Sequence, residues 1–262
     1  MATQLDSLLR LALGDTRFQP TRKRVRVVLD GENVADGLGV LVWEPRRVVP
    51  TYALRESDVS ATLRPVDAVP VDVDRPILYP SDPFSAHTSA GHSLDVVTGA
   101  GRREAAAFAL TDPDVAGLIA FDFAAFDWLE EDDTIVGHPR DPFHRIDIRR
   151  SSRTIRIEAA GTVLAQSTRA RALFETSIPV VRYYFPPDDV IVGLTPTDTH
   201  TYCAYKGRAS YFSATVGGAE LPDIAWAYPE PLSDATTIDG LVAFYQERLE
   251  VFIDGQPQGD VG

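Results

Sequence analysis

Val25-Arg26-Val27-Val28-Leu29-Asp30-Gly31 is the stretch that decides the fold of the first half of this chain. Val25, Val27 and Leu29 alternate with Arg26 and Val28, and an Asp-Gly pair follows at once, which is a strong signal for a β-hairpin. Ile155-Arg156-Ile157-Glu158-Ala159-Ala160-Gly161 repeats the pattern about 130 residues later. The sequence therefore predicts the same antiparallel element in both halves.

The similarity between the halves extends beyond these two hairpins. The matched positions are Ala35 with Ala165, Tyr52 with Tyr183, Asp58-Val59 with Asp189-Val190, His87-Thr88 with His200-Thr201, and 117–121 with 240–244. The period is too long for a solenoid. We therefore predict a mainly β protein of two homologous small antiparallel domains with a few short helices. Residues 1–137 would be the first repeat with an N-terminal helix, 138–150 a connector, and 151–262 the second repeat.

Local patterns refine this prediction. Alternation and turn residues predict strands at 169–174, 180–185, 209–216 and 249–253, with Ile224, Trp226 and Tyr228 on one strand face. Apolar spacing predicts short helices at 4–13 and 238–248. Residues 64–86, rich in Pro and Asp, are expected to form a long loop in the first repeat, whose role the sequence does not give.

Composition excludes several classes of function. The formal net charge is −13 at pH 7, whereas phosphate and anionic lipid surfaces attract basic proteins. We therefore expect no nucleic-acid partner and no membrane partner. The chain contains one cysteine, which excludes an internal disulfide and suits a reducing cytoplasm. No signal-peptide pattern is evident at the N-terminus, so a cytoplasmic location is expected.

The segment 200–207, His-Thr-Tyr-Cys-Ala-Tyr-Lys-Gly, is the most unusual part of the chain. It holds the single cysteine, Cys203, and one of only two lysines, Lys206, in a chain rich in arginine. Lysine is a compact charge whose pKa falls readily on burial, whereas arginine stays charged. The segment is therefore the first candidate for a functional site.

Comparison of the two repeats separates architecture from chemistry. Aligned on His87 and His200, the first repeat has Ala90, His92 and Ser93 where the second has Cys203, Tyr205 and Lys206. The first repeat thus appears as a degenerate support for the second. Glu175 lies beside apolar residues and needs a partner, for which Lys206 or Arg182 is suitable. The predicted ligand-binding residues are Glu175, Arg182, Tyr184, Tyr205, Lys206, Tyr211, Trp226 and Tyr228, and Lys206 and Cys203 are the catalytic candidates.

Several motifs of the second half resemble a known family. Leu173-Phe174-Glu175-Thr176, Tyr183-Tyr184-Phe185-Pro186, Cys203-Ala204-Tyr205-Lys206-Gly207 and Ala225-Trp226-Ala227-Tyr228-Pro229 are similar to motifs of the bacterial domain of unknown function 427 family, also labelled nucleotidyltransferase domain 9. Ala204 stands where the family motif has proline. The resemblance implies a small β-tent, or Mss4-like, domain. Relatives in that wider fold bind zinc through paired Cys-x-x-Cys knuckles, which one cysteine cannot form.

The sequence gives little support to metal or nucleotidyl-transfer chemistry. The five histidines do not pair at metal-ligand spacing, and His138 and His144 in the connector are interpreted as structural or solvated. Asp188 and Asp189 are adjacent and would diverge on a strand, and no Gly-rich phosphate loop precedes a helix. We therefore predict no metal and no cofactor.

Three hypotheses remain open. The leading one is a small-molecule-binding protein with one pocket in the second repeat, where Lys206 binds an anion or carbonyl and Trp226 and the tyrosines form apolar walls. The aromatic residues could equally be ordinary core. The second is a transferase or hydrolase that uses Lys206 or Cys203 as a nucleophile. The third is a structural or interaction module, an internal pseudo-dimer that could also form homo-oligomers.

Overall fold

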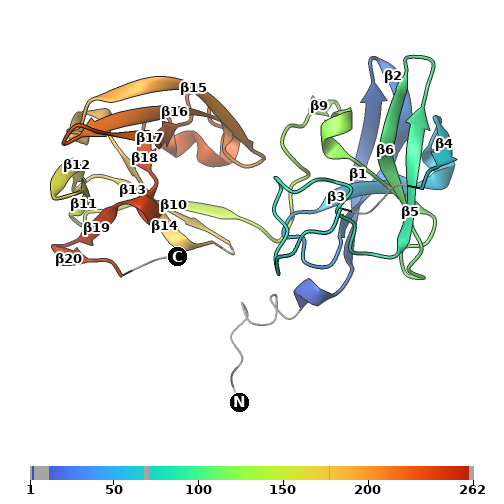
Figure 1. Cartoon of the computed structure of the whole chain (residues 1–262), viewed down its shortest axis with the longest axis horizontal. Coiled ribbons are helices and arrows are strands. Elements are labelled where there is room, and N and C mark those ends of the chain that lie inside the picture. The colour runs from blue at the N-terminus through green and yellow to red at the C-terminus, as the bar shows by residue number, and fades with distance from the viewer. Residues whose placement is uncertain (1, 3–11, 68–70, 177, 260–262) are drawn as a thin grey trace. The chain divides into compact units, whose positions relative to one another are not determined.

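The computed structural model describes residues 2, 12–67, 71–176 and 178–259, and the protein is mainly β, as predicted (Figure 1). The chain divides into two compact units, Met1–Asp141 and Pro142–Gly262. Every strand pairing between named strands is antiparallel among the residues that the structure describes. Each unit is described by itself below.

The N-terminal unit is built on one sheet with the strand order β4-β5-β6-β7-β3-β2-β1-β8-β9. Its strands are β1 (Arg17–Leu29), β2 (Glu32–Trp43), β3 (Thr51–Arg55), β4 (Thr62–Pro65), β5 (Gly91–Val97), β6 (Arg102–Leu110), β7 (Leu118–Phe121), β8 (Asp127–Glu130) and β9 (Asp133–Thr134). Short 3₁₀ turns are η1 (Ala12–Gly14), η2 (Glu56–Asp58) and η3 (Phe123–Ala125). Between β4 and β5 the described residues run without a regular strand, in and around the predicted long loop.

The C-terminal unit contains two sheets, with the orders β10-β13-β14-β18-β17-β16-β15 and β12-β11-β19-β20. Its strands are β10 (Ile146–Arg150), β11 (Ile155–Ala159), β12 (Thr162–Ser167), β13 (Arg171–Glu175), β14 (Ile178–Phe185), β15 (Leu194–Cys203), β16 (Gly207–Val216), β17 (Ala219–Ala227), β18 (Val242–Phe244), β19 (Glu250–Ile253) and β20 (Gln256–Pro257). The 3₁₀ turns are η4 (Pro187–Asp189), η5 (Ser233–Ile238) and η6 (Gln246–Arg248). Figure 1 shows β15 to β18 side by side in orange.

The two hairpins predicted from the opening motif both form. Asp30 (φ 49°) and Gly31 (φ 86°) join β1 to β2, and Ala160 (φ 48°) and Gly161 (φ 75°) join β11 to β12. Two successive residues with positive φ are what a tight two-residue hairpin requires, because this turn matches the twist of the flanking strands. Aspartate tolerates this conformation, whereas alanine adopts it at a cost.

Strand pairing is equivalent in the two units at several points. Val27 pairs with Ala35 as Ile157 pairs with Ala165, and a register shift follows in both hairpins. The further equivalent pairs are Leu41–Tyr52 with Ala172–Tyr183, Ala53–Ala120 with Tyr184–Ala243, and Phe108–Ala120 with Trp226–Ala243. Tyr184 and Trp226 thus correspond in the fold to Ala53 and Phe108.

The long strand β1 corresponds to two strands of the C-terminal unit. Its first part pairs Arg17 with Trp43, as β10 pairs Asp147 with Phe174, and its second part matches β11. In β1 the register slips between Pro20 and Arg24, and at the matching place the C-terminal chain leaves the first sheet and enters the second. Residues 146–150, within the segment expected as a connector, are therefore a strand of the C-terminal unit.

Buried apolar residues form two clusters in each unit. In the N-terminal unit the larger contains Val25, Leu29, Tyr52 and Trp128, and the smaller contains Phe108, Leu110 and Ala120. In the C-terminal unit the larger contains Ile155, Tyr183, Phe185 and Phe244. The smaller C-terminal cluster contains Leu173, Tyr184, Tyr211, Trp226 and Tyr228. Alternation along β13 and β14 places neighbouring side chains in different clusters.

Two local predictions differ from the structure, and a third is not tested by it. The helix predicted at 238–248 is wrong, because Val242–Phe244 is strand β18, between two 3₁₀ turns, and is fully covered by its neighbours. Ile224 packs in the larger cluster and not with Trp226 and Tyr228, because the chain takes a positive φ of 48° at Asp223, where the β16–β17 register shifts. The helix predicted at 4–13 lies almost wholly outside the described residues.

Candidate functional site

Glu175 is the centre of a buried polar cluster in the C-terminal unit. It ends strand β13, and its side chain is 11% exposed. One carboxylate oxygen, Oε2, accepts a hydrogen bond from Lys206 Nζ at 2.6 Å, and the other, Oε1, lies 3.1 Å from His144 Nε2. A carboxylate buried among apolar residues needs such partners, because it has lost its hydration. Glu175 therefore joins two polar side chains that lie far apart in the sequence.

The turn between β15 and β16 positions Lys206. Cys203 ends β15 and pairs with Gly207 at the start of β16, so Ala204, Tyr205 and Lys206 form the turn. Gly207 has a φ of 98°, and a Cβ there would lie 3.1 Å from the Glu230 carbonyl oxygen, which explains the glycine. The Lys206 side chain is 9% exposed. Among the described residues, Glu175 is the one hydrogen-bond partner of its ammonium group.

His144 is a member of this cluster that the sequence analysis missed. We had interpreted it as a structural or solvated residue of the connector, but its side chain is 18% exposed and contacts Glu175. The Tyr205 ring lies 4.5 Å from the His144 ring, centroid to centroid. The missed signal was the spacing of about 130 residues that relates the two opening hairpins. The same spacing makes β10 the counterpart of the start of β1, so the C-terminal unit begins before residue 150.

The charge state of Glu175 follows from its partners. Burial alone would raise the pKa of this carboxyl group, and it is the largest single influence. The hydrogen bond from His144 and the charge and hydrogen bond of Lys206 together outweigh burial, so the pKa of Glu175 lies below its ordinary value. Glu175 is consequently ionised at neutral pH and holds the Lys206 ammonium as an ion pair.

Four predicted site residues form an aromatic cluster close to this ion pair in the fold. Tyr184, Tyr211, Trp226 and Tyr228 are each at most 8% exposed and pack in one cluster with Leu173 and the partly buried Cys203. Tyr211 contacts Thr201 Oγ1 through its hydroxyl at 3.0 Å. Tyr245, which the sequence analysis did not single out, lies 4.7 Å from the Trp226 ring. The aromatic side chains are therefore close-packed with one another.

The buried tyrosines are neutral phenols and not phenolates. Burial raises the pKa of Tyr184 and of Tyr228 far above the ordinary value of 10.0. In Tyr184 the hydrogen bond from Trp226 opposes this rise without cancelling it. Burial also raises the pKa of Tyr245 to about 12. These hydroxyl groups thus keep their protons throughout the neutral range.

Arg182 and Cys203 have different surroundings from Lys206. Arg182 is paired with Glu247, at 2.5 Å, and lies over the Trp226 ring at 5.1 Å, so it is not a partner of Glu175. Cys203 is free and half-buried. A thiol becomes reactive where cations or a base lower its pKa. No described residue hydrogen-bonds to the Cys203 thiol, so the structure offers no activating group for it.

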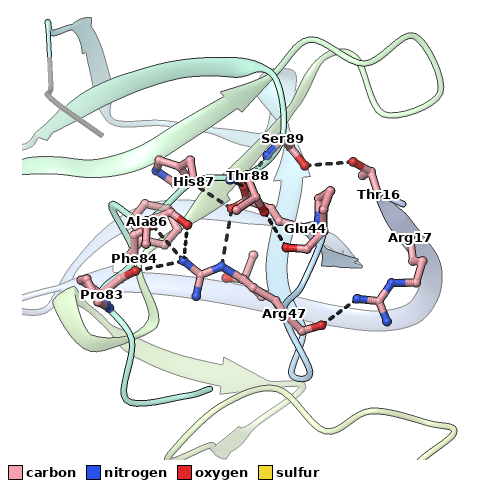
Figure 2. Close-up of polar contacts among 12 residues, drawn as sticks. Thr16, Arg17, Glu44, Arg47, Pro83, Phe84, Ala86, His87, Thr88 and Ser89 are labelled. Atoms are coloured by element: carbon pink, nitrogen blue, oxygen red, sulfur yellow. Dashed lines mark hydrogen bonds and ion pairs between the residues drawn. The ribbon is translucent and has the colours of Figure 1, made fainter. Parts of the chain in front are cut away.

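The N-terminal unit holds a second buried glutamate at the equivalent place. Glu44 follows β2 as Glu175 ends β13, and it is 3% exposed (Figure 2). Its carboxylate contacts His87 Nδ1 at 3.0 Å and accepts backbone N–H bonds from Thr88 at 2.7 Å and Ser89 at 2.9 Å. Burial would raise the pKa of Glu44, but His87 and these two N–H groups lower it below the ordinary value.

The structure corrects one sequence match between the two units. Ser93 pairs with Phe108 as Tyr211 pairs with Trp226, so β5 corresponds to β16, and Thr88 corresponds to Lys206. His87 therefore matches Tyr205, and the match of His87 with His200 is wrong. His200 lies on β15 with its Nδ1 3.2 Å from the Ala209 carbonyl, whereas His87 contacts the buried Glu44. A backbone N–H in one unit thus takes the place of the lysine ammonium in the other.

The arrangement in the C-terminal unit suits recognition of a polar group. A buried ammonium has three N–H donors, so beyond the one that Glu175 accepts it can donate to an anion or a carbonyl oxygen. Among the described residues, no group of three or more His, Cys, Asp or Glu side chains has metal-binding geometry. In the same part of the chain, no helix is long and apolar enough to cross a membrane.

The match to a known family covers part of the C-terminal unit. No curated protein matches the chain. Residues 147–255, which include Glu175 and Lys206 and leave out His144, match the family model NTP_transf_9, described as domain of unknown function DUF427.

Proposed function

We propose that the C-terminal unit binds a small molecule through an anionic or carbonyl group, with Lys206 as the binding cation. The observation that carries this proposal is the buried Glu175–Lys206 pair, at 2.6 Å. Burying an ion pair seldom adds to stability, because desolvation opposes the attraction between the charges. A polar group kept in such surroundings therefore suggests a task other than folding.

The binding hypothesis fits the geometry better than nucleophilic catalysis. The Lys206 Nζ donates a hydrogen bond to the Glu175 carboxylate at 2.6 Å, so it is engaged as a donor and is not presented as a free nucleophilic amine. Protonated hydroxyls of Tyr184 and Tyr228 would add neutral donors. Because these side chains pack against one another, the ligand would contact the polar cluster at His144, whose side chain is 18% exposed, and not an open cavity. The single free cysteine is compatible with the proposed cytoplasmic location.

Two lysines in the whole chain make a direct test possible. Biosynthetic labelling with ¹³Cε-lysine marks Lys23 and Lys206 alone, so the NMR spectrum holds few signals. Benzoate is the probe, and benzyl alcohol is its uncharged counterpart. We expect benzoate to shift the Lys206 signal in a saturable manner and benzyl alcohol to leave it unchanged.

Variants identify the site. Lys206→Met removes the charge and keeps the aliphatic chain, and Lys23→Met is the matched control, because Lys23 is half-exposed and pairs with Glu130. Benzoate should raise the midpoint of thermal unfolding in the wild type and in Lys23→Met but not in Lys206→Met. A benzoate effect that persists in Lys206→Met would remove Lys206 from the site and overturn the proposal.

A further inference from the structure

The N-terminal unit has a cavity where the C-terminal unit has an aromatic side chain. This cavity has a volume of about 610 Å³, within the range of small-molecule sites. Its lining includes His87, Gly91, Ser93, Leu94 and Phe108. Ser93 occupies the strand position that Tyr211 holds in β16. A small side chain thus leaves open a space that the corresponding tyrosine fills in the other unit.

Phe108 and Gly91 define the apolar wall of this cavity. Phe108 is 4% exposed and pairs with Ser93 across the strands. A Cβ on Gly91 would lie 2.4 Å from an edge carbon of the Phe108 ring and equally close to the Ala109 carbonyl oxygen. The glycine therefore allows the Phe108 ring to lie against the backbone of β5. Leu94, 7% exposed, adds a second apolar residue to the lining.

His87, a residue of this lining, has a ring nitrogen without a hydrogen-bond partner among the described residues. Its side chain is 7% exposed, and its ring stacks on Phe108 with the centroids 3.6 Å apart and an interplanar angle of 12°. Nδ1 contacts Glu44, but Nε2 is buried and has no hydrogen-bond partner among the described residues. Two other buried polar atoms of the described residues lack a hydrogen-bond partner, one on Arg17 and one on Arg26. Neither residue lines the cavity. A buried group without a partner is costly, and natural proteins seldom keep one without a reason.

The Glu44 carboxylate determines what Nε2 can recognise. An ionised carboxylate only accepts hydrogen bonds, so the 3.0 Å contact with Nδ1 requires that Nδ1 carry the proton. In the tautomer with this proton on Nδ1, the imidazole of His87 presents a lone pair at Nε2. This lone pair accepts a hydrogen bond from an N–H or O–H group of a ligand.

The loop that carries His87 is held in place by Arg47. The Arg47 guanidinium, 12% exposed, donates to the carbonyl oxygens of Pro83 at 2.9 Å and Ala86 at 3.0 Å, and Figure 2 shows these bonds beside Glu44. Ser89 Oγ contacts Thr16 Oγ1 at 2.9 Å on the other side of the loop. The position of the His87 ring is therefore fixed from both ends of its loop, as a preformed binding site requires.

We propose that this cavity is a second ligand site, which binds a planar aromatic molecule that donates an N–H or O–H to His87 Nε2. Phe108 and Leu94 provide apolar contacts, and the polar edge contains Ser93 and Asp67. The carboxylate of Asp67 and the net charge of −13 favour an uncharged or cationic ligand over an anion. The site lies in the other unit from Lys206 and is independent of the function proposed there.

Indole and 1-methylindole test this proposal on the full chain, because they differ in the single N–H donor. Imidazole nitrogens are followed by ¹H–¹⁵N NMR correlations that resolve the five histidines. We expect indole at millimolar concentration to shift His87 Nε2 in a saturable manner, and 1-methylindole to bind at least tenfold more weakly, as loss of one buried hydrogen bond of about 1.4 kcal/mol implies. Equal binding of the two probes, or no saturable shift with indole, would overturn the proposal.

Two variants connect the response to the cavity. Ser93→Tyr fills the space as Tyr211 does in the C-terminal unit, keeps His87 intact, and should abolish indole binding while the protein stays folded. His87→Asn should also abolish binding, whereas His200→Asn, on an exposed part of β15, should not. Indole binding that survives in Ser93→Tyr would place it elsewhere. A response of His87 to zinc chloride and not to indole would make this a metal site and contradict the proposed ligand class.

Discussion

Glu44 and Glu175 show how two units can solve the same burial problem in different ways. Both carboxylates are buried at equivalent positions and contact a histidine, at 3.0 Å and 3.1 Å. In the N-terminal unit backbone N–H groups of Thr88 and Ser89 complete the environment, whereas in the C-terminal unit the Lys206 ammonium does so. Neutral backbone donors make Glu44 part of a fixed loop. The partner of Glu175 is a side-chain cation, which can turn from the carboxylate toward a ligand.

The difference has a consequence for each unit. In the N-terminal unit the Thr88 and Ser89 N–H groups donate to Glu44, and the cavity lies beside His87. In the C-terminal unit Tyr211 and Trp226 stand at the positions of Ser93 and Phe108 and pack against each other. The Glu175–Lys206 pair lies beside these aromatic residues. We therefore interpret Glu44 chiefly as a structural residue and Glu175 as a residue that positions Lys206.

The largest expected effect is on stability in the N-terminal unit. Glu44→Ala should lower the free energy of unfolding by about 4 kcal/mol, because His87 and two backbone N–H groups lose their acceptor inside the protein. Glu175→Ala should cost about 2 kcal/mol, since its partners are side chains that can turn toward water. Native-state hydrogen exchange measured peptide by peptide reports each unit separately. Equal losses in the two variants would contradict the contrast between the glutamates.

Removing the cation tests the C-terminal half of the comparison. Lys206→Met should lower the free energy of unfolding of this unit by about 1–2 kcal/mol, because Glu175 keeps His144 as a partner. Thr88→Ala, at the equivalent position of the N-terminal unit, should cost no more than about 1 kcal/mol, since its backbone N–H to Glu44 remains. Hydrogen exchange of the two variants gives both values. A larger loss in Thr88→Ala would show that its side chain, which donates to the Pro45 carbonyl, matters more than the backbone contact.

Acid should weaken both units through their glutamates. The pKa values of Glu44 and Glu175 are lowered in the folded protein, so the stabilisation is fully present above the ordinary value of 4.5 and is lost as the pH falls through the folded pKa values. The free energy of unfolding should therefore decline below about pH 4.5. Denaturant unfolding of the wild type, Glu44→Gln and Glu175→Gln at successive pH values tests this. Each amide variant should show a shallower decline, and unchanged slopes in both would assign the acid sensitivity to other carboxylates.

The sequence predicted the elements whose signals are local. The alternation of Val25, Val27 and Leu29 and the following Asp30-Gly31 turn lie within one strand and one hairpin, so periodicity alone identifies them. The Glu175–Lys206 contact was also predicted, because a glutamate among apolar residues requires a cation or other donors.

The parts that the sequence did not predict depend on long-range pairing. His144 contacts Glu175 because β10 pairs with β13. Ile146 and Ile148 alternate with Asp147 and Arg149, but this short pattern gives no indication of which strand β10 pairs with. The identical letters His-Thr placed His87 opposite His200, but the pairing of β5 with β6 gives a different register. The cavity beside Ser93 follows from the volume of side chains on neighbouring strands, which an alignment of letters does not measure.

The smallest expected effect concerns the two hairpin turns. Ala160 is exposed and has a φ of 48°. An alanine in this left-handed conformation costs about 1 kcal/mol. Asparagine adopts the conformation readily, and Asn-Gly is the preferred pair for this turn. Ala160→Asn should therefore raise the free energy of unfolding of the C-terminal unit by about 0.5–1 kcal/mol. Asp30→Ala should lower that of the N-terminal unit by a similar amount, with a small addition from the exposed ion pair to Arg103. Denaturant unfolding with hydrogen exchange distinguishes the units. If Ala160→Asn proves neutral or destabilising, backbone strain at Ala160 does not make the β11–β12 turn less stable than the β1–β2 turn. The bulge next to each turn would then be the feature to vary.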